Sequence, residues 1–352
     1  MRVQFFRHGL LFLLLLFTAC ATTVTPRTEI EGRALIEERH IQRNIALQQN
    51  VRDNGQIQNV GFPLLEAAVP FCDSNIVKSI GLDIATGYDF DESFQRSAME
   101  VLSAGASVTV IGVVDFGPSA LAGVQVEDVI SEINGNPVIS GENASSIFNN
   151  LLQEELRDNE SITLSVLRGE EVLDLEITPV RICDYKLALV LTDDLNAFAD
   201  GDNVFVTRRM LRFTDNDKEL GLVIAHELAH NIMNHIGKQR QNYSLGSLVD
   251  LAARSQGIDT DGLFGDLTGK AYSQAFEAEA DYVGMYILAR TGMDLDGASY
   301  FWRRMAVENP GNIDSHSASL PATAERFLAL EQVVTEILEK KAAGIPLDPE
   351  RK

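Results

Sequence analysis

The residues with the clearest chemical potential are His226, Glu227 and His230, which stand in the order H-E-x-x-H. The run 214–237 contains no proline, begins with residues that favour helix N-caps and ends at Gly237, so we expect one helix. Positions four apart lie on one face of a helix, so both imidazoles can bind one ion. This pattern is typical of zinc enzymes in which the glutamate takes a proton from the attacking water.

The same stretch does not supply a third ligand. His235 is nine positions beyond His226 and would lie on the opposite side of a continuous helix. Met233 and Ile236 occupy the positions where another class of zinc enzymes has a glycine and a third histidine. A third ligand must therefore come from elsewhere in the chain. The alternative is a buried helix that carries two incidental histidines and no metal.

Residues 272–284, YSQAFEAEADYVG, contain three acidic candidates. Glu277 and Asp281 are four positions apart and share a helix face, whereas Glu279 lies about 200° round from Glu277. Glu277 can therefore bind zinc while Asp281 accepts the far N–H of a ligand histidine and fixes its tautomer. The alternative is a solvated acidic face in an acidic protein.

HELAH followed by EAEAD resembles the CAAX-prenyl-protease-like family of gluzincin zinc metallopeptidases, especially its soluble periplasmic, HtpX-related and BepA-like members. The likeness covers about 184–330 and includes NAFADGDNVFVTRRML before the zinc helix and MDLDGASYFWRRM after the glutamate helix. It implies that the zinc ligands are His226, His230 and Glu277. It also implies that Glu227 is the general base and that Asp281 supports a ligand histidine.

The sequence departs from this family at two positions. Gln274 stands where the family often has arginine, and Leu320 stands where a histidine often precedes the proline of the SLPATAER segment. In some relatives that histidine approaches the zinc. His316, four residues before Leu320, is a candidate for the same role, and the alternative is a histidine in a surface loop.

The N-terminus has the features of a secretion signal. Arg2 and Arg7 precede the apolar run LLFLLLLF, which is too short to span a bilayer. The following TAC resembles a bacterial lipobox, in which Cys20 becomes the lipidated first residue, although Phe17 stands where leucine is usual. Ala21 is not the aspartate that favours inner-membrane retention by the same resemblance. We therefore expect a lipid anchor in the outer membrane, facing the periplasm; the alternative is ordinary secretory cleavage beside an unmodified cysteine.

The other two cysteines are Cys72 and Cys183, in the similar contexts FCD and ICD. An oxidising compartment permits them to pair. They stand at the two edges of a distinct segment, so a disulfide would close the neck of an insertion. Two free buried thiols are the alternative.

Residues 117–138, GPSALAGVQVEDVISEINGNPV, resemble the signature of PDZ domains. The surrounding pattern agrees, with a β-rich run at 106–114, an amphipathic helix at 145–156 and a strand hairpin at 161–180. PDZ domains bind extended peptide ends as an added strand, so the resemblance implies a protein partner or substrate end at this domain. A purely structural insertion is the alternative.

The composition limits the partners. The chain has 51 acidic and 29 basic residues and a net charge of −22, which disfavours nucleic acid and anionic lipid surfaces. Beyond the signal, no apolar run reaches about 18 residues, so we expect a soluble catalytic domain on a tether.

These patterns predict an α+β protein: a mainly helical zincin-type metalloprotease domain with a small sheet, and an inserted β-rich PDZ-like domain. An N-terminal helix is expected at about 28–50 and a C-terminal helix at 322–341. The expected segments are a lipoprotein signal peptide (1–19), a tether with a helical part of the protease domain (20–79), the PDZ-like insertion (80–182), the zinc metalloprotease domain (183–341) and a polar tail (342–352).

The predicted function is zinc-dependent hydrolysis of peptide bonds in misfolded or misassembled envelope proteins. The strand NVFVT, 203–207, is expected to form the edge of the cleft on which substrate lies as an added strand. The alternative function is a PDZ-bearing lipoprotein adaptor or chaperone whose zinc site is largely latent. The intact Glu227 argues against it, because a binding role needs no base.

Overall fold

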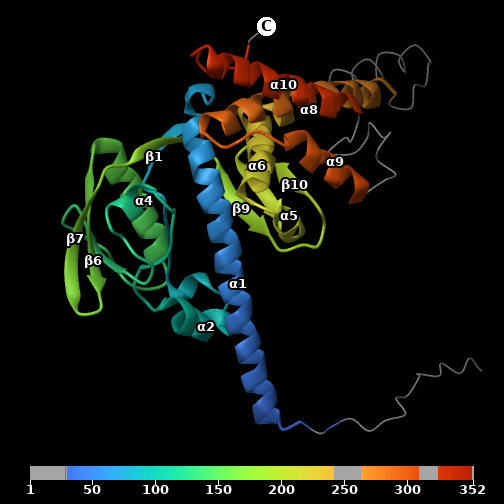
Figure 1. The fold of residues 1–352 in the computed structure, drawn as a ribbon. Coiled ribbons are helices and arrows are strands. Elements are labelled where there is room, and N and C mark those ends of the chain that lie inside the picture. Colours follow the sequence, from blue (N-terminus) through green and yellow to red (C-terminus); the bar gives the residue numbers. More distant parts are fainter. Residues whose placement is uncertain (1–27, 29, 242–262, 309–323, 351–352) are drawn as a thin grey trace, which may run out of the picture. The chain divides into compact units, whose positions relative to one another are not determined.

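The computed structural model describes residue 28 and residues 30–241, 263–308 and 324–350 (Figure 1). The chain divides into two compact units, Met1–Ile41 and Gln42–Lys352. The predicted α+β class is confirmed, because long helices are combined with three separate sheets in the described residues. Helix α1 spans Gly32–Ala67, so it is longer than the helix expected at 28–50.

The PDZ-like part is built on one sheet with the strand order β2-β3-β4-β6-β7, and the short β5 pairs with β4. Phe148 of the helix α4 packs with Val110, Ile133 and Leu164 of the sheet in one buried cluster. A smaller cluster joins Leu47 of α1 to the helix α2. The elements are β2 (Leu82–Ala85), η2 (Gly87–Asp89), α2 (Glu92–Leu102), β3 (Thr109–Val113), α3 (Pro118–Leu121), β4 (Val129–Ile133), β5 (Asn136–Pro137), α4 (Ala144–Asp158), β6 (Ile162–Arg168) and β7 (Glu171–Ile177).

A two-stranded ribbon forms the neck where the chain enters and leaves this sheet. The strand β1 (Ile76–Ser79) pairs antiparallel with β8 (Val180–Cys183), and Ser79 lies opposite Val180. Cys72, which follows the short helix η1 (Val69–Phe71), forms a disulfide with Cys183, and their Cα atoms are 5.8 Å apart. Both cysteines are buried in the core of the helical part.

A second, three-stranded sheet has the order β10-β11-β9. The strand β11 (Asn203–Thr207) pairs in parallel with β9 (Lys186–Val190) and antiparallel with β10 (Ala197–Ala199). The prediction that 203–207 forms an edge strand is therefore wrong. The chain reverses after β10, so β10 lies at an edge of the sheet and β11 lies in its centre.

The helix that carries the H-E-x-x-H residues is α6, Asp217–Ile232. The side chain of Asn216 caps it by accepting a hydrogen bond from the backbone N–H of Glu219 at 3.1 Å. The helix ends before Gly237 because Asn234 adopts a left-handed backbone conformation with φ 51°, and residues 235–241 begin a separate helical segment.

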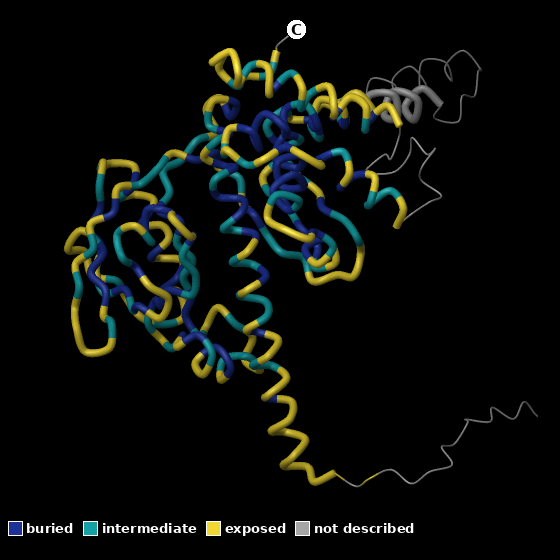
Figure 2. Tube along the Cα trace, in the orientation of Figure 1, coloured by how far each residue is buried: buried dark blue, intermediate teal, exposed yellow. Residues whose placement is uncertain are grey.

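The remaining helices share one core with α6, which is buried along most of its length (Figure 2). They are α5 (Arg208–Phe213), α8 (Leu263–Arg290), α9 (Ala298–Glu308) and α10 (Ala324–Ala342). Leu222 and Val223 of α6 share one core with Tyr286 of α8, Trp302 of α9 and Leu330 of α10. Among the helices of the described residues, none combines the length and apolar character that a membrane crossing needs.

Candidate metal centre

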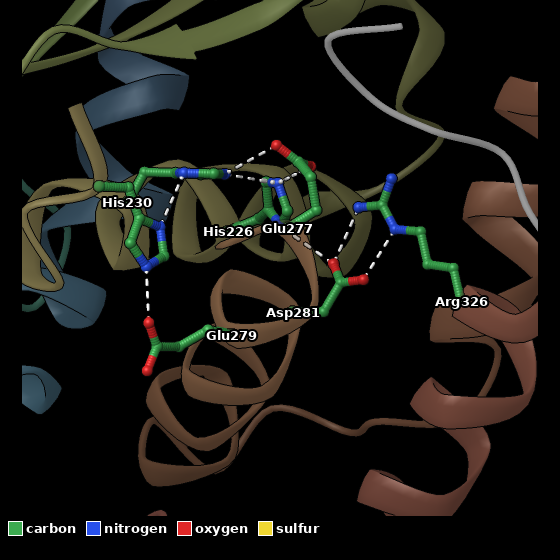
Figure 3. Close-up of polar contacts among 7 residues, drawn as sticks. His226, His230, Glu277, Glu279, Asp281 and Arg326 are labelled. Carbon is green, nitrogen blue, oxygen red and sulfur yellow. Dashed lines mark hydrogen bonds and ion pairs between the residues drawn. The ribbon is translucent and has the colours of Figure 1, made fainter. Parts of the chain in front are cut away.

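Three potential ligand atoms converge between α6 and α8 (Figure 3). The Nε2 atoms of His226 and His230 are 3.2 Å apart. Glu277 places Oε2 at 3.3 Å from His226 Nε2 and Oε1 at 3.4 Å from His230 Nε2. The structure therefore brings together the two histidines of α6 and the acidic residue that helical spacing singled out on α8.

The three distances, of which the two from Glu277 start from different carboxylate oxygens, are close to the ligand spacing of a tetrahedral zinc ion. Ligands at about 2.0–2.1 Å from such an ion lie about 3.3–3.4 Å from one another. Within the described residues, the buried Oε2 atom of Glu277 has no hydrogen-bond partner, as is expected of an oxygen that faces a cation. Two imidazoles and a carboxylate also form a donor set that zinc accepts, so the residues fit the metal.

The electrostatics favour positive charge at the same point. Burial alone would lower the pKa of His226, but the carboxylates of Asp281 and Glu277 raise it to about 10. Burial and the neighbouring charge of His226 lower the pKa of His230 to about 2. The two carboxylates therefore stabilise positive charge at this point.

Glu227 lies between the two histidines in sequence and is 4% exposed. Burial is the largest cause that raises its pKa, to about 7, and the nearby Glu277 acts in the same direction. A carboxyl group with this pKa can both accept and release a proton near neutral pH. Burial thus raises the proton affinity of the Glu227 carboxylate.

A buried ion pair contacts His226 at its Nδ1 atom. Its Nδ1 atom lies 2.9 Å from Asp281 Oδ1, and Arg326 of α10 donates to Asp281 through Nε at 2.7 Å and through a terminal nitrogen at 2.8 Å. The guanidinium also lies 4.1 Å from the centre of the Trp302 ring. Burial would raise the pKa of Asp281, but Arg326 and His226 lower it below its ordinary value. Asp281 is therefore an anion that can hold the orientation of His226.

Sequence reasoning missed Arg326. The residue belongs to the SLPATAER segment, in which only Leu320 stands out as a departure from the family. A buried arginine is rarely left without a carboxylate, but sequence alone does not tell which acid lies near it. The pairing with Asp281 follows from the packing of α10 on α8.

Gly284 explains how α8 comes close enough to α6. A Cβ atom at this position would lie 3.0 Å from the carbonyl oxygen of Ala225 and 3.1 Å from the backbone nitrogen of His226. These are backbone atoms, which cannot move aside without displacing the helix. The absence of a side chain at Gly284 therefore sets the helix spacing at which Glu277 reaches both histidines.

Asn231 connects α6 to the small sheet. Its side chain accepts a hydrogen bond from the Gly201 N–H at 2.8 Å and donates to the Asn203 carbonyl at 2.9 Å. Gly201 lies in the turn between β10 and β11. This residue, next to His230, therefore fixes the β10–β11 hairpin relative to the helix that carries the candidate ligands.

His235 was expected to point away from the site, yet its ring contacts His230. The expectation assumed one helix over 214–237. The helix instead ends before Asn234, whose left-handed conformation turns His235 toward His230. Two candidates, Cys20 and His316, lie outside the described residues.

Comparison with known proteins identifies two regions of the chain. Residues 169–334 match the family model for peptidase family M48, and residues 81–178 match the model for the PDZ domain. The two matches share 169–178, and this overlap includes β7, which pairs with β6 in the PDZ-like sheet.

Three named proteins are similar to part of this chain. The Beta-barrel assembly-enhancing protease of Yersinia pestis is 33% identical over 135 residues, which cover 34% of this chain and 27% of that protein. The mitochondrial metalloendopeptidase OMA1 of Saccharomyces cerevisiae is 32% identical over 156 residues, with coverages of 43% and 44%. Metalloprotease LoiP of Escherichia coli is 28% identical over 148 residues, with coverages of 39% and 57%. The chain thus matches about a quarter of the length of the first of these relatives and just over half of the last.

Proposed function

We propose that this chain, whose residues 169–334 match peptidase family M48 and whose residues 81–178 match the PDZ domain, is a zinc-dependent endopeptidase of the bacterial cell envelope. The observation that carries the proposal is the convergence of His226, His230 and Glu277, whose nearest nitrogen and oxygen atoms lie 3.2, 3.3 and 3.4 Å apart, close to the ligand spacing of tetrahedral zinc. Relatives that are named metalloendopeptidases support the same reaction class.

In this proposal His226, His230 and Glu277 hold the metal. Bound zinc would supply Lewis acidity toward the scissile carbonyl and the attacking water. Glu227 accepts the proton that the water loses and returns it to the amine that leaves. Its pKa of about 7, raised by burial, suits both transfers near neutral pH. Asp281 and Arg326 keep His226 in one orientation throughout.

The substrate class in this proposal is an extended polypeptide from a misfolded or misassembled envelope protein. The edge strand β10 is the proposed partner of the substrate, since β11 has strand neighbours on both sides and the Leu187 carbonyl of β9 already accepts a hydrogen bond from Gln58 of α1. Asn231 ties this hairpin to α6, so a peptide bound along β10 would be fixed relative to the metal site. The name of the Yersinia pestis relative, a β-barrel assembly-enhancing protease, supports an envelope substrate.

The proposed location is the outer membrane, facing the periplasm, with the chain held by a lipid on Cys20. The support is the lipobox-like sequence and the absence of aspartate at position 21. Cys20→Ser should release the protein into the soluble periplasmic fraction. Mass spectrometry that finds an unmodified Cys20 would contradict the anchor.

The decisive experiment compares the wild-type mature protein with Glu227→Gln and Glu277→Ala. We expect about one zinc per chain in wild type and in Glu227→Gln, whose cleavage of casein falls by about 10²–10⁴-fold because the base is lost. Glu277→Ala should lose both zinc and cleavage. The matched control is Glu339→Ala, which removes an exposed carboxylate of α10 and should change neither. If Glu227→Gln retains wild-type turnover, the proposed mechanism is wrong.

The PDZ domain favours one second candidate, an adaptor or chaperone with a latent zinc site. This function predicts that wild type and Glu227→Gln suppress the aggregation of an unfolded protein equally well. It also predicts that neither protein cleaves that substrate. Cleavage by wild type alone would exclude it.

A further inference from the structure

The second ligand histidine has its own partners, which lie on the side of the ring away from the candidate metal position (Figure 3). His230 Nδ1 is 3.0 Å from His235 Nδ1. The other nitrogen of His235, Nε2, is 2.8 Å from Glu279 Oε2. A continuous path therefore runs from a carboxylate through one imidazole to a second imidazole that faces the candidate metal position.

The chemistry of imidazole determines the direction of every hydrogen bond in this path. His230 must keep a lone pair on Nε2 to bind a metal, so its proton is on Nδ1 and is donated to His235. His235 therefore accepts at Nδ1 and carries its own proton on Nε2. That proton is donated to Glu279. Only this arrangement satisfies all four nitrogens and the carboxylate at once.

The position of His235 is fixed by its surroundings. Its side chain is 3% exposed and its ring stacks on Phe276 of α8, with centroids 4.6 Å apart and an interplanar angle of 15°. The left-handed conformation of Asn234 turns the chain so that His235 faces His230 and not solvent. A histidine held in this way restricts the rotation of the ligand ring that it contacts.

We propose that His235 and Glu279 are positioning residues that fix the tautomer and orientation of His230, and that they set the affinity of the centre for zinc. The inference rests on the proposed zinc site. It gives each ligand histidine a carboxylate: Asp281 acts directly on His226, whereas Glu279 acts on His230 through His235. The Glu279 side chain is 45% exposed, so we expect its contribution to be smaller than that of the buried His235.

The test measures the zinc dissociation constant of the full mature protein by competition with a chelator. His235→Phe keeps an aromatic ring for Phe276 but removes both nitrogens, and we expect affinity to fall by about 10- to 100-fold. His235→Gln offers a carbonyl to His230 and an amide N–H to Glu279, so it should recover most of the loss. Glu279→Ala should weaken binding by about 10-fold, and the control Glu339→Ala should not.

Two further measurements separate positioning from folding. The metal-free melting temperatures of Glu279→Ala and His235→Gln should match that of wild type. The double variant His235→Phe/Glu279→Ala should bind zinc no more weakly than His235→Phe, because the two residues act in series. Wild-type affinity in His235→Phe, or in Glu279→Ala if the former does not fold, would overturn the relay. Failure of wild type itself to bind zinc would instead overturn the proposed function.

Discussion

At the scale of single residues, the ion pair of Asp281 and Arg326 is a buried charge pair beside the candidate centre. The side chains are 8% and 6% exposed, and two hydrogen bonds join them. Removing one member of such a pair takes from the other buried charge its bidentate partner, which is more costly than the pair itself is stabilising. The pair therefore connects the orientation of His226 to the stability of the α8–α10 packing.

We predict that Arg326→Met lowers the free energy of unfolding of the metal-free protein by about 3–5 kcal/mol. Asp281→Asn should also destabilise, because it removes the buried carboxylate that accepts two hydrogen bonds from the guanidinium. The double variant should lose clearly less than the sum of the two, since both charges of this pair are then absent. Urea denaturation in the presence of EDTA measures all four states of this cycle. Additivity within about 0.5 kcal/mol would mean that the two side chains are not coupled.

At the scale of elements, the spacing of α6 and α8 decides whether ligands from two helices can meet. Gly284 permits the close approach, because a Cβ atom there would contact the backbone of Ala225 and His226. Gly55 of α1 is the matched control: it also lies within a helix, but a Cβ atom there has nothing within 4 Å.

We predict opposite effects for alanine at the two glycines. Gly284→Ala should lower the free energy of unfolding by about 1–3 kcal/mol through overpacking, and it should weaken zinc binding because it separates Glu277 from the histidines. Gly55→Ala should raise stability by about 0.5–1 kcal/mol through helix propensity, without changing zinc affinity. Denaturation curves and zinc titrations test both. Equal zinc affinity in Gly284→Ala and wild type would show that the centre tolerates a wider helix spacing.

At the scale of the whole molecule, the PDZ domain is joined to the helical part through the β1–β8 ribbon. Ser79 and Val180 are paired in this ribbon, and the Cys72–Cys183 disulfide closes the neck behind it. A two-residue Asn-Gly turn can therefore connect Ser79 to Val180 in place of 80–179 and leave the ribbon and the disulfide in place.

We predict that this deletion preserves zinc binding and the cleavage of short peptides. Cleavage of long unfolded chains should fall by about 10-fold or more, because only these can bind the PDZ domain and the active site together and gain from the raised effective concentration. The deleted protein should also carry Leu47→Gln, since this residue packs against α2. Equal losses on short and long substrates would instead make the domain a structural part of the catalytic site.

Local patterns in the sequence were sufficient for much of the candidate site and of the fold. Helical periodicity placed His226 and His230 on one face and selected Glu277 and Asp281 over Glu279, because positions four apart lie together on any α-helix. Alternation and turn residues likewise indicated the PDZ-like strands. These features depend on neighbours in the chain, so an isolated segment already contains the information.

Other features were decided only by the tertiary structure. The break at Asn234 brought His235 onto His230, and the packing of three helices brought Glu279 to His235 and Arg326 to Asp281 across 44 and 45 positions of sequence. The strand order β10-β11-β9 likewise depends on which chain reversal follows β10. The physical reason is that helical and strand periods specify which side of an element a residue occupies, whereas the packing between elements specifies what lies opposite it.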